Sequence, residues 1–289
     1  MRVAVVGLGG VGGYLAAKFA QAGIDVVGFA RGEHLHAIQK NGIMIKEDET
    51  ETLTPLSAKE LCEVEGKFDL LLFCVKSYDI VKSYQEIAPC IDKKSVLISF
   101  SNGVDNGDKL RELSDARVLD GVIYILSHIE KAGVIRKKGK LFAAVFGGDR
   151  EATQLLADLF EKATLRYKIA EDIQTALWKK YIFIATFATL TSYYDKPIAT
   201  IYKEHYDEAK AVLQEIAAVA KSRGVMIEDE VQKALDTASK LPVDASTSMH
   251  LDFQNKKVTE LESLSGYIAK EKSVKTPLME KMYKELRTI

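Results

Sequence analysis

Short apolar runs alternate with amphipathic segments of helical length over roughly the first 170 residues. Arg2–Val6 and Asp25–Phe29 are apolar runs typical of strands, and Val11–Gln21 between them carries its apolar residues on one helical face. Further strands are predicted at Asp69–Val75, Ser95–Phe100 and Val118–Tyr124, and further helices at Gly32–Lys40, Ser77–Ile87, Asn106–Leu113 and Gln154–Ala163. This order is typical of βαβ units and predicts a mainly parallel sheet.

Two segments interrupt the alternation. Gly42–Lys46 and Glu51–Leu56, which flank an acidic tripeptide, are predicted to form a hairpin. Within Gly133–Phe146 we expect two strands around Lys137–Lys140, forming an antiparallel edge of the sheet. Leu165–Ile169 is one further expected strand.

The pattern changes after about Ala170, where the strand signal disappears and helical periodicity continues to the last residues. Helices are predicted at Thr175–Tyr194, Lys203–Arg223, Asp229–Lys240, Lys257–Lys270 and Thr276–Arg287. The predicted fold class is therefore α/β, with an N-terminal Rossmann-type domain of mainly parallel sheet (residues 1–170). An all-helical C-terminal domain (residues 171–289) follows it.

Composition narrows the class of protein. The chain has 289 residues, of which 47% are hydrophobic and 28% charged, as in a globular protein of two domains. The net charge of −1 leaves no basic surplus for a nucleic-acid partner. The uncharged stretch Tyr181–Tyr194 is too short to span a bilayer, so no membrane partner is expected. Cysteines without CxxC spacing and histidines without ligand spacing favour a cytoplasmic protein with no metal site.

A glycine-rich motif follows the first predicted strand and opens the first helix. With the spacing G-x-G-x-x-G, its residues are Gly7, Leu8, Gly9, Gly10, Val11 and Gly12. In a dinucleotide site the first glycine permits a tight turn, the second lets the backbone approach a pyrophosphate, and the third allows close packing of helix on strand. The helix N-terminus then offers free N–H groups to the phosphates. A βα turn without a ligand is the alternative.

The residue at the end of the second strand indicates which cofactor binds. NAD sites usually place Asp or Glu there to bind the ribose 2′-OH, whereas this chain has Arg31. A guanidinium binds a 2′-phosphate in bidentate fashion, so Arg31 favours NADP(H) as the cofactor. The alternative is a solvated arginine that caps the next helix.

Lys76 and Asn102 also follow predicted strands. Ligands bind outside the carboxyl ends of the strands in open α/β sheets, so both side chains are candidates to face the cofactor. Each has an equally good structural explanation, Lys76 as a surface lysine beside an N-cap and Asn102 as part of an Asn-Gly turn.

In the helical half, Lys180 lies at the mouth of an apolar segment. A lysine there can extend its amino group harmlessly to solvent. A desolvated lysine instead has a lowered pKa and can serve as a proton donor. Ser248 and Glu260 are polar residues beside apolar helix faces, and their spacing alone does not establish a site.

Taken in order, these residues resemble the ketopantoate reductase (2-dehydropantoate 2-reductase) family. The resemblance runs from Gly7 to about Pro277 and includes the glycine motif and the arginine after the second strand. The other matching motifs are Val75-Lys76, Asn102-Gly103, Trp178-x-Lys180, Ser248-Met249, Thr259-Glu260 and Thr276-Pro277. No single motif is specific, but the ordered set is.

The resemblance implies NADPH-dependent reduction of ketopantoate to pantoate, in pantothenate (vitamin B5) and CoA biosynthesis, in a cleft between the two domains. By family analogy, Lys180 is the general acid and Glu260 orients both that lysine and the substrate. Ser248 helps to hold the substrate carboxylate, while Asn102 and Lys76 position cofactor and substrate. An ammonium beside the developing alkoxide both stabilises charge and supplies the proton.

Three positions depart from the family pattern. The asparagines usual four and eight residues after the lysine are Ile184 and Ala188 here, both expected to line the substrate site, and Ser265 replaces a later asparagine. Losing two amides weakens selection for a hydroxylated substrate. Two alternatives to ketopantoate reduction therefore stay open: a paralogous NADPH-dependent reductase of a more apolar 2-keto acid, and a non-catalytic NADPH sensor. The expected partners are small molecules, and a homodimer is left open.

Overall fold

A computed structural model describes residues 1–289, which divide into two compact units. The first unit consists of Met1–Ser101 and Asp105–Ile173, and the second of Asn102–Val104 and Gln174–Ile289. Residues 102–104 therefore belong with the helical unit, although they follow a strand of the sheet. The assignment of NADP(H) binding to residues 1–170 and of substrate binding to residues 171–289 stays a prediction.

The first unit is built on a ten-stranded sheet. In spatial order its strands are β4 (Thr50–Thr54), β3 (Ile43–Glu47), β9 (Val134–Gly147), β8 (Arg117–Lys131), β7 (Val96–Ser99), β6 (Leu70–Phe73), β1 (Arg2–Val6), β2 (Asp25–Phe29) and β5 (Ser57–Lys59), with β10 (Tyr167–Ile169) paired to β9. Only β3–β4 and β8–β9 are antiparallel pairs. The run β5-β2-β1-β6-β7-β8 has the strand order of a dinucleotide-binding fold, which confirms the predicted Rossmann-type sheet.

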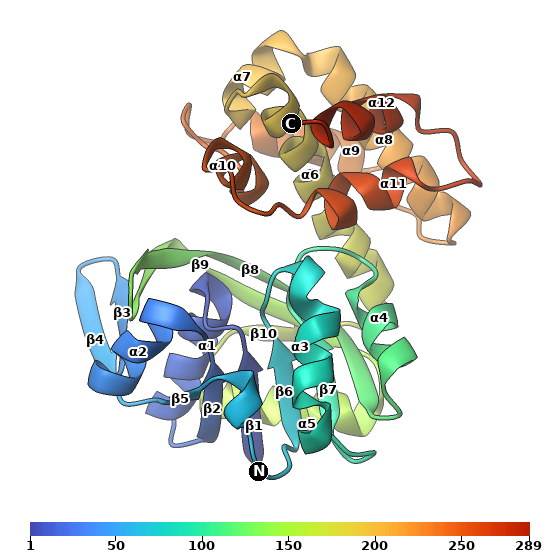
Figure 1. The fold of residues 1–289 in the computed structure, drawn as a ribbon. Coiled ribbons are helices and arrows are strands. Elements are labelled where there is room, and N and C mark those ends of the chain that lie inside the picture. Colours follow the sequence, from blue (N-terminus) through green and yellow to red (C-terminus); the bar gives the residue numbers. More distant parts are fainter. The chain divides into compact units, whose positions relative to one another are not determined.

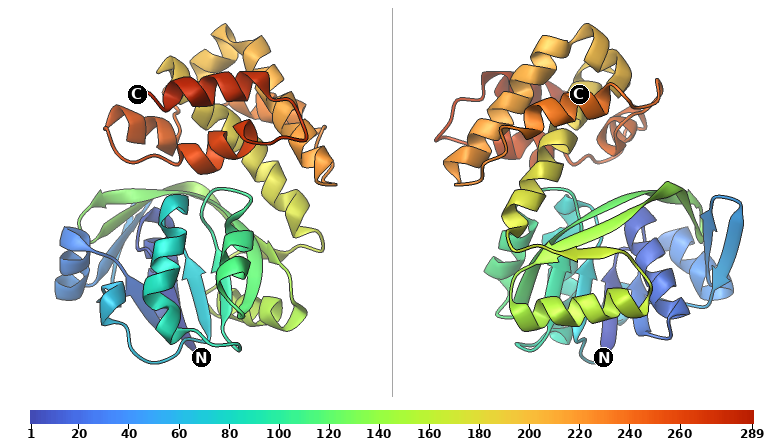
Figure 2. Two further views of the ribbon diagram at one scale, coloured as in Figure 1. Left: turned by 45° about the vertical axis from the view of Figure 1, so that its right-hand side comes forward. Right: turned by 180° about the vertical axis from the view of Figure 1, so that it is seen from behind.

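Helices cover both faces of this sheet (Figures 1 and 2). Successive residues of β1 point to opposite faces, so Val3 and Val5 enter one hydrophobic core while Ala4 and Val6 enter the other. The first core includes residues of α1 (Gly10–Gln21), α2 (Gly32–Asn41) and α5 (Arg150–Lys162), and the second includes residues of α3 (Ile80–Ile87) and α4 (Asn106–Leu113). Burial on both faces explains why these strands are continuous apolar runs in the sequence.

The expected hairpin is confirmed as the antiparallel pair β3–β4. The two strands expected around Lys137–Lys140 are wrong, because β9 is one strand that runs from Val134 to Gly147. Its register against β8 shifts between the pairs Ile125↔Phe142 and Ser127↔Lys137, which leaves residues 138–141 as an irregularity. Nor is β9 an edge strand, because β3 pairs with its first half in parallel. The hairpin strand β3 is distant from β9 in the chain, so their pairing leaves no local signal in the sequence.

The second unit is helical, as predicted. Its helices are α6 (Ile173–Tyr194), α7 (Ile198–Glu204), α8 (Tyr206–Ser222), α9 (Glu230–Ala238), α10 (Ser248–Gln254), α11 (Tyr267–Ala269) and α12 (Pro277–Leu286). The helix expected over Lys203–Arg223 is interrupted at His205, which divides it into α7 and α8. The helix expected over Lys257–Lys270 begins later than predicted and contains a π-helical turn at Glu262–Gly266.

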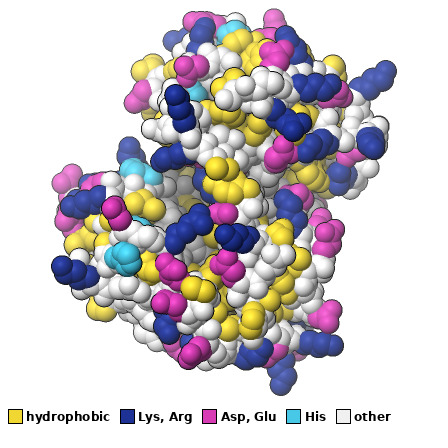
Figure 3. Space-filling model, in the orientation of Figure 1, with side chains coloured by type: hydrophobic (Ala, Val, Ile, Leu, Met, Phe, Trp, Pro, Cys, Tyr) yellow, Lys and Arg dark blue, Asp and Glu magenta, His cyan; other side chains and the backbone are white.

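The distribution of charge on the surface reflects the nearly equal numbers of basic and acidic residues in the chain. On the face drawn in Figure 3, Lys and Arg side chains are interspersed with Asp and Glu. None of the helices combines the length and the apolar character that crossing a membrane requires.

Candidate functional site

The glycine-rich loop joins β1 to α1 by a tight turn. The backbone N–H groups of Gly7 and Leu8 both donate to the carbonyl oxygen of Phe29, at 3.0 and 3.1 Å. Gly7 has a φ of +96°, a conformation that residues with a side chain rarely adopt. A Cβ atom on Gly12 would lie 2.0 Å from the carbonyl oxygen of Gly7, so helix and strand can approach only because residue 12 is glycine. These two glycines are needed by the fold itself.

Gly9 differs from its neighbours. A Cβ atom built on it meets no protein atom within 4 Å, whereas one on Gly10 would lie 2.3 Å from the backbone oxygen of Ser127. The fold therefore leaves open space beside Gly9, at the start of α1, where the first-turn N–H groups have no intrahelical partner. That combination fits a phosphate group, which binds readily to a helix N-terminus. The residues present thus fit the dinucleotide expected from the sequence.

The other two residues of the motif have side chains that serve the core. Leu8 is buried against β2, and the half-buried Val11 packs on the first hydrophobic core.

Arg31 and Asp79 meet at the same end of the sheet. Arg31 follows β2 and is the N-cap of α2, while Asp79 ends a 3₁₀ turn (Ser77–Asp79) that follows β6. A guanidinium nitrogen of Arg31, Nη2, lies 3.3 Å from Oδ2 of Asp79. The Arg31 side chain is otherwise 79% exposed.

Lys76 lies where the sequence predicted, just after β6, and it is the half-buried N-cap of the same 3₁₀ turn. Its carbonyl oxygen accepts a hydrogen bond from the backbone N–H of Asp79 at 2.9 Å. Burial raises the pKa of the neighbouring Cys74 thiol to about 12, so this cysteine is neutral and serves packing.

His34, which the sequence did not single out, braces the glycine-rich loop. The backbone N–H of Gly133 donates to Nδ1 of His34 at 3.0 Å, so the remaining proton of the neutral ring lies on Nε2. Nε2 can then donate to the carbonyl oxygen of Leu8, 2.8 Å away. Burial lowers the pKa of His34, which favours the neutral ring over the charged one. A histidine in a surface helix gives no hint of such a role.

In the second unit, Lys180 of α6 donates a hydrogen bond from Nζ to Oδ1 of Asn102 at 3.2 Å. Two polar residues 78 positions apart are thus brought together. Desolvation lowers the pKa of Lys180 to about 8, and the negative charge of the buried Glu260 opposes that shift only in part. Lys180 can therefore hold or release a proton near neutral pH.

Lys179, the adjacent lysine, takes a different environment. Its amino group lies 3.2 Å from Oε1 of Glu230, and its side chain is 39% exposed. Neighbouring residues of a helix are about 100° apart, so the two lysines face different surroundings.

The other three residues predicted to bind substrate lie on two helices. Ala188 is buried and Ile184 half-buried on α6, whereas Ser248 is exposed at the first turn of α10. Ser265 is fully buried, with its hydroxyl 2.7 Å from Oγ1 of Thr189, so it joins α6 to the π-helical turn.

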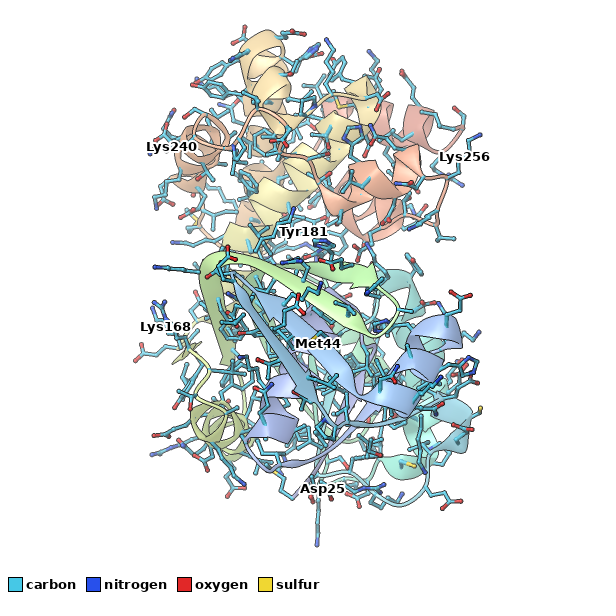
Figure 4. All side chains as sticks on the ribbon, turned by 90° about the vertical axis from the view of Figure 1, so that its left-hand side faces the viewer. Asp25, Met44, Lys168, Tyr181, Lys240 and Lys256 are labelled. Carbon is cyan, nitrogen blue, oxygen red and sulfur yellow. The ribbon has the colours of Figure 1, made fainter.

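Tyr181 connects the helix of Lys180 to the segment that follows Glu260. Its hydroxyl, on the residue labelled in Figure 4, donates to the carbonyl oxygens of Leu264 and Ser263 at 2.6 and 3.1 Å. Both carbonyls belong to the π-helical turn Glu262–Gly266. Such turns occur often at functional sites, but helical periodicity in the sequence does not reveal them.

Comparison with known proteins covers nearly the whole chain. Residues 3–148 match the family model described as ketopantoate reductase PanE/ApbA, and residues 172–289 match the model of its C-terminal domain. An uncharacterized oxidoreductase of Bacillus subtilis (strain 168) is 29% identical over 99% of this chain and 98% of its own length.

Solved structures agree. The 2-dehydropantoate 2-reductase of Porphyromonas gingivalis W83 is 30% identical, covers 99% of each chain and superposes with a TM-score of 0.85. A D-mandelate dehydrogenase solved with NADH and anilino(oxo)acetate is 21% identical, covers 100% of this chain and 98% of its own, and shares the fold with a TM-score of 0.90. The chain belongs to the ketopantoate reductase family and is an oxidoreductase that uses a nicotinamide cofactor.

Proposed function

We propose that this protein reduces a 2-keto acid to a 2-hydroxy acid with NADPH, and that ketopantoate, reduced to pantoate for pantothenate and CoA biosynthesis, is its first candidate substrate. The proposal rests on the environment of Lys180. Its amino group is desolvated, donates a hydrogen bond to Asn102 and interacts electrostatically with Glu260. A relative of known name, the 2-dehydropantoate 2-reductase of Porphyromonas gingivalis, supports this choice of substrate.

The proposed chemistry needs a hydride and a proton. Bound NADPH supplies the hydride to the keto carbon. Lys180 donates its proton to the keto oxygen as negative charge develops there, and the resulting amine recovers a proton from solvent. Glu260 keeps the lysine charged and oriented, and Asn102 fixes the position of the amino group. Ser248 is assigned to the substrate carboxylate.

The cofactor assignment rests on the first unit. The open space beside Gly9 and the unpaired N–H groups of α1 suit a pyrophosphate, and Arg31 offers a guanidinium for the 2′-phosphate of NADP(H). Lys76 adds a positive charge at the same end of the sheet. Because the chain's three cysteines are free thiols, a reducing cytoplasm suits the protein.

A second candidate substrate is a branched aliphatic 2-keto acid. Ile184 and Ala188 lie four and eight residues after Lys180 and offer neither a donor nor an acceptor to a substrate hydroxyl. Ser265 does not compensate, because its hydroxyl is already bonded to Thr189 inside the unit.

The first prediction concerns the glycine-rich loop. Gly9→Val should abolish NADPH binding without unfolding the protein, since the new side chain enters open space that the pyrophosphate would occupy. Gly12→Val is the matched comparison, and it should destabilise the fold because its Cβ collides with backbone. Fluorescence titration with NADPH and thermal melting separate the two effects. Near-native NADPH affinity in Gly9→Val would place the cofactor elsewhere.

The second prediction concerns cofactor choice. Arg31→Ala should weaken NADPH binding by about tenfold or more, since a charge-assisted bond to the phosphate is lost, and should barely affect NADH. Dissociation constants for both cofactors provide the measurement. Equal losses for the two would mean that Arg31 has only a structural role.

The third prediction concerns the proton donor. Because the pKa of Lys180 is lowered to about 8 and the donor must be protonated, kcat/KM for reduction should fall as the pH rises through that region. Lys180→Ala should lower kcat by about 10²-fold or more and remove this limb, while NADPH still binds. Lys179→Ala is the control and should be mild. The reverse pattern would contradict the assignment.

The fourth prediction tests the substrate, by following NADPH oxidation with a panel of 2-keto acids. With Ile184 and Ala188 in place of amides, ketoisovalerate and ketopantoate should have kcat/KM values within about tenfold of each other. Ile184→Asn together with Ala188→Asn should shift preference toward ketopantoate by about 1–3 kcal/mol. A native kcat/KM that is a hundredfold or more higher for ketopantoate than for ketoisovalerate would contradict this prediction and identify ketopantoate as the substrate. Turnover of no keto acid despite tight NADPH binding would favour a sensor.

A further inference from the structure

The ion pair between Arg31 and Asp79 lies at the end of the sheet where the proposed NADP(H) site is located. β2 and β6 pair in parallel with β1 on its two sides, so the residues after all three strands lie at one end of the sheet. Arg31 follows β2, the glycine-rich loop follows β1, and Asp79 follows β6. The ends of β2 and β6 thus flank the loop, and the guanidinium of Arg31 and the carboxylate of Asp79 bond to each other at 3.3 Å.

The two partners differ in freedom. Asp79 ends a short 3₁₀ turn, its backbone N–H is bonded to Lys76, and its side chain is 27% exposed. The Arg31 side chain is 79% exposed and has several rotatable bonds. Between them, Arg31 is the partner that moves, and the carboxylate of Asp79 is a fixed negative charge.

This arrangement treats the two nicotinamide cofactors differently. A phosphate monoester carries about −1.5 to −2 charges at neutral pH, so it needs Arg31 and is repelled by Asp79. A ribose that ends in 2′-OH is neutral, needs no cation, and can donate to a carboxylate. Asp79, in the 3₁₀ turn after β6, places a carboxylate at the end of the sheet where NAD-binding folds place one after the second strand.

We infer that Asp79 sets the cofactor selectivity of this protein. It holds Arg31 in the free protein and opposes the 2′-phosphate, so NADPH binding must release Arg31 from Asp79 whereas NADH binding need not. The inference rests on the proposed function, because it assumes that the ligand is a nicotinamide dinucleotide bound at the glycine-rich loop. If Asp79 acts in this way, the protein prefers NADPH over NADH by a smaller factor than it would with Arg31 and no carboxylate at position 79.

Asp79→Asn tests this inference, because it keeps the size and an acceptor oxygen but removes the charge. The dissociation constant for NADPH should fall by roughly threefold to tenfold at low salt, the scale of a single like-charge contact exposed to water. The value for NADH should stay the same or rise. Raising the ionic strength should shrink the NADPH effect, since exposed charges are screened. The same titrations with 2′,5′-ADP and 5′-AMP isolate the phosphate from the nicotinamide.

Asp108→Asn is the matched control. Asp108 also pairs with an exposed arginine of the first unit, Arg111 at 2.8 Å, so its substitution changes the net charge equally and should leave both cofactor affinities unchanged. Asp79→Asn should also have a smaller effect on NADPH in an Arg31→Ala background, because there is then no ion pair to release.

Weaker or unchanged NADPH binding in Asp79→Asn would overturn the inference, and weaker binding would show instead that Asp79 holds Arg31 ready for the phosphate. That result differs from a failure of the proposed function. If Arg31→Ala left NADPH binding intact, the NADP(H) assignment itself would be wrong. If Arg31→Ala weakened NADPH as expected and Asp79→Asn had no effect, only the role of Asp79 would be lost.

Discussion

Parallel pairing of β2, β1 and β6 is the constraint on which the proposed cofactor site depends. Because the three strands run in one direction, each delivers the residue that follows it to the same edge of the sheet. The edge therefore gathers the turn at Gly7, the N-cap Arg31 and the 3₁₀ turn that ends at Asp79, although these residues lie far apart in the chain. The close approach at Gly12 fixes where α1 begins, and with it the direction of the N–H groups.

In the helical unit the constraint is the free-energy cost of keeping the ammonium group of Lys180 away from water. Lys180 meets that cost with an amide oxygen of Asn102 and the charge of Glu260, and the incomplete compensation appears as its lowered pKa. A lysine in this state is poised to give up a proton near neutral pH. Lys179 beside it has a carboxylate partner, Glu230, and a side chain that is partly exposed to solvent.

Local patterns in the sequence predicted much of this structure. β1 and β2 have the predicted bounds, and the glycine motif lies at the predicted junction. Asp79 was missed because an acidic residue in the first turn of a helix is ordinary and complements the helix dipole. His34 and Tyr181 were missed because their bonds join segments remote in the chain. The pairing of β3 with β9 was missed for the same reason, since long-range contacts leave no periodic trace.

The polar groups of the helical unit are unevenly distributed along α6. Lys180, in the first half of α6, is bonded to an amide and influenced by a carboxylate, whereas the side chains of Ile184 and Ala188 further along carry no polar atom. Of the hydroxyls on this part of α6, Thr189 is bonded to Ala185 and Ser265, and Thr191 to Phe187 and Thr247. The buried hydroxyl of Thr186, two residues from both Ile184 and Ala188, has no hydrogen-bond partner. Under the proposed function, the polar recognition that Lys180 provides is directed at the keto group common to all 2-keto acids. Under the proposed function, a substrate tail that meets Ile184 and Ala188 is selected by its shape and apolar surface, because a hydroxyl beside these two side chains finds no partner in them and loses its hydrogen bonds to water.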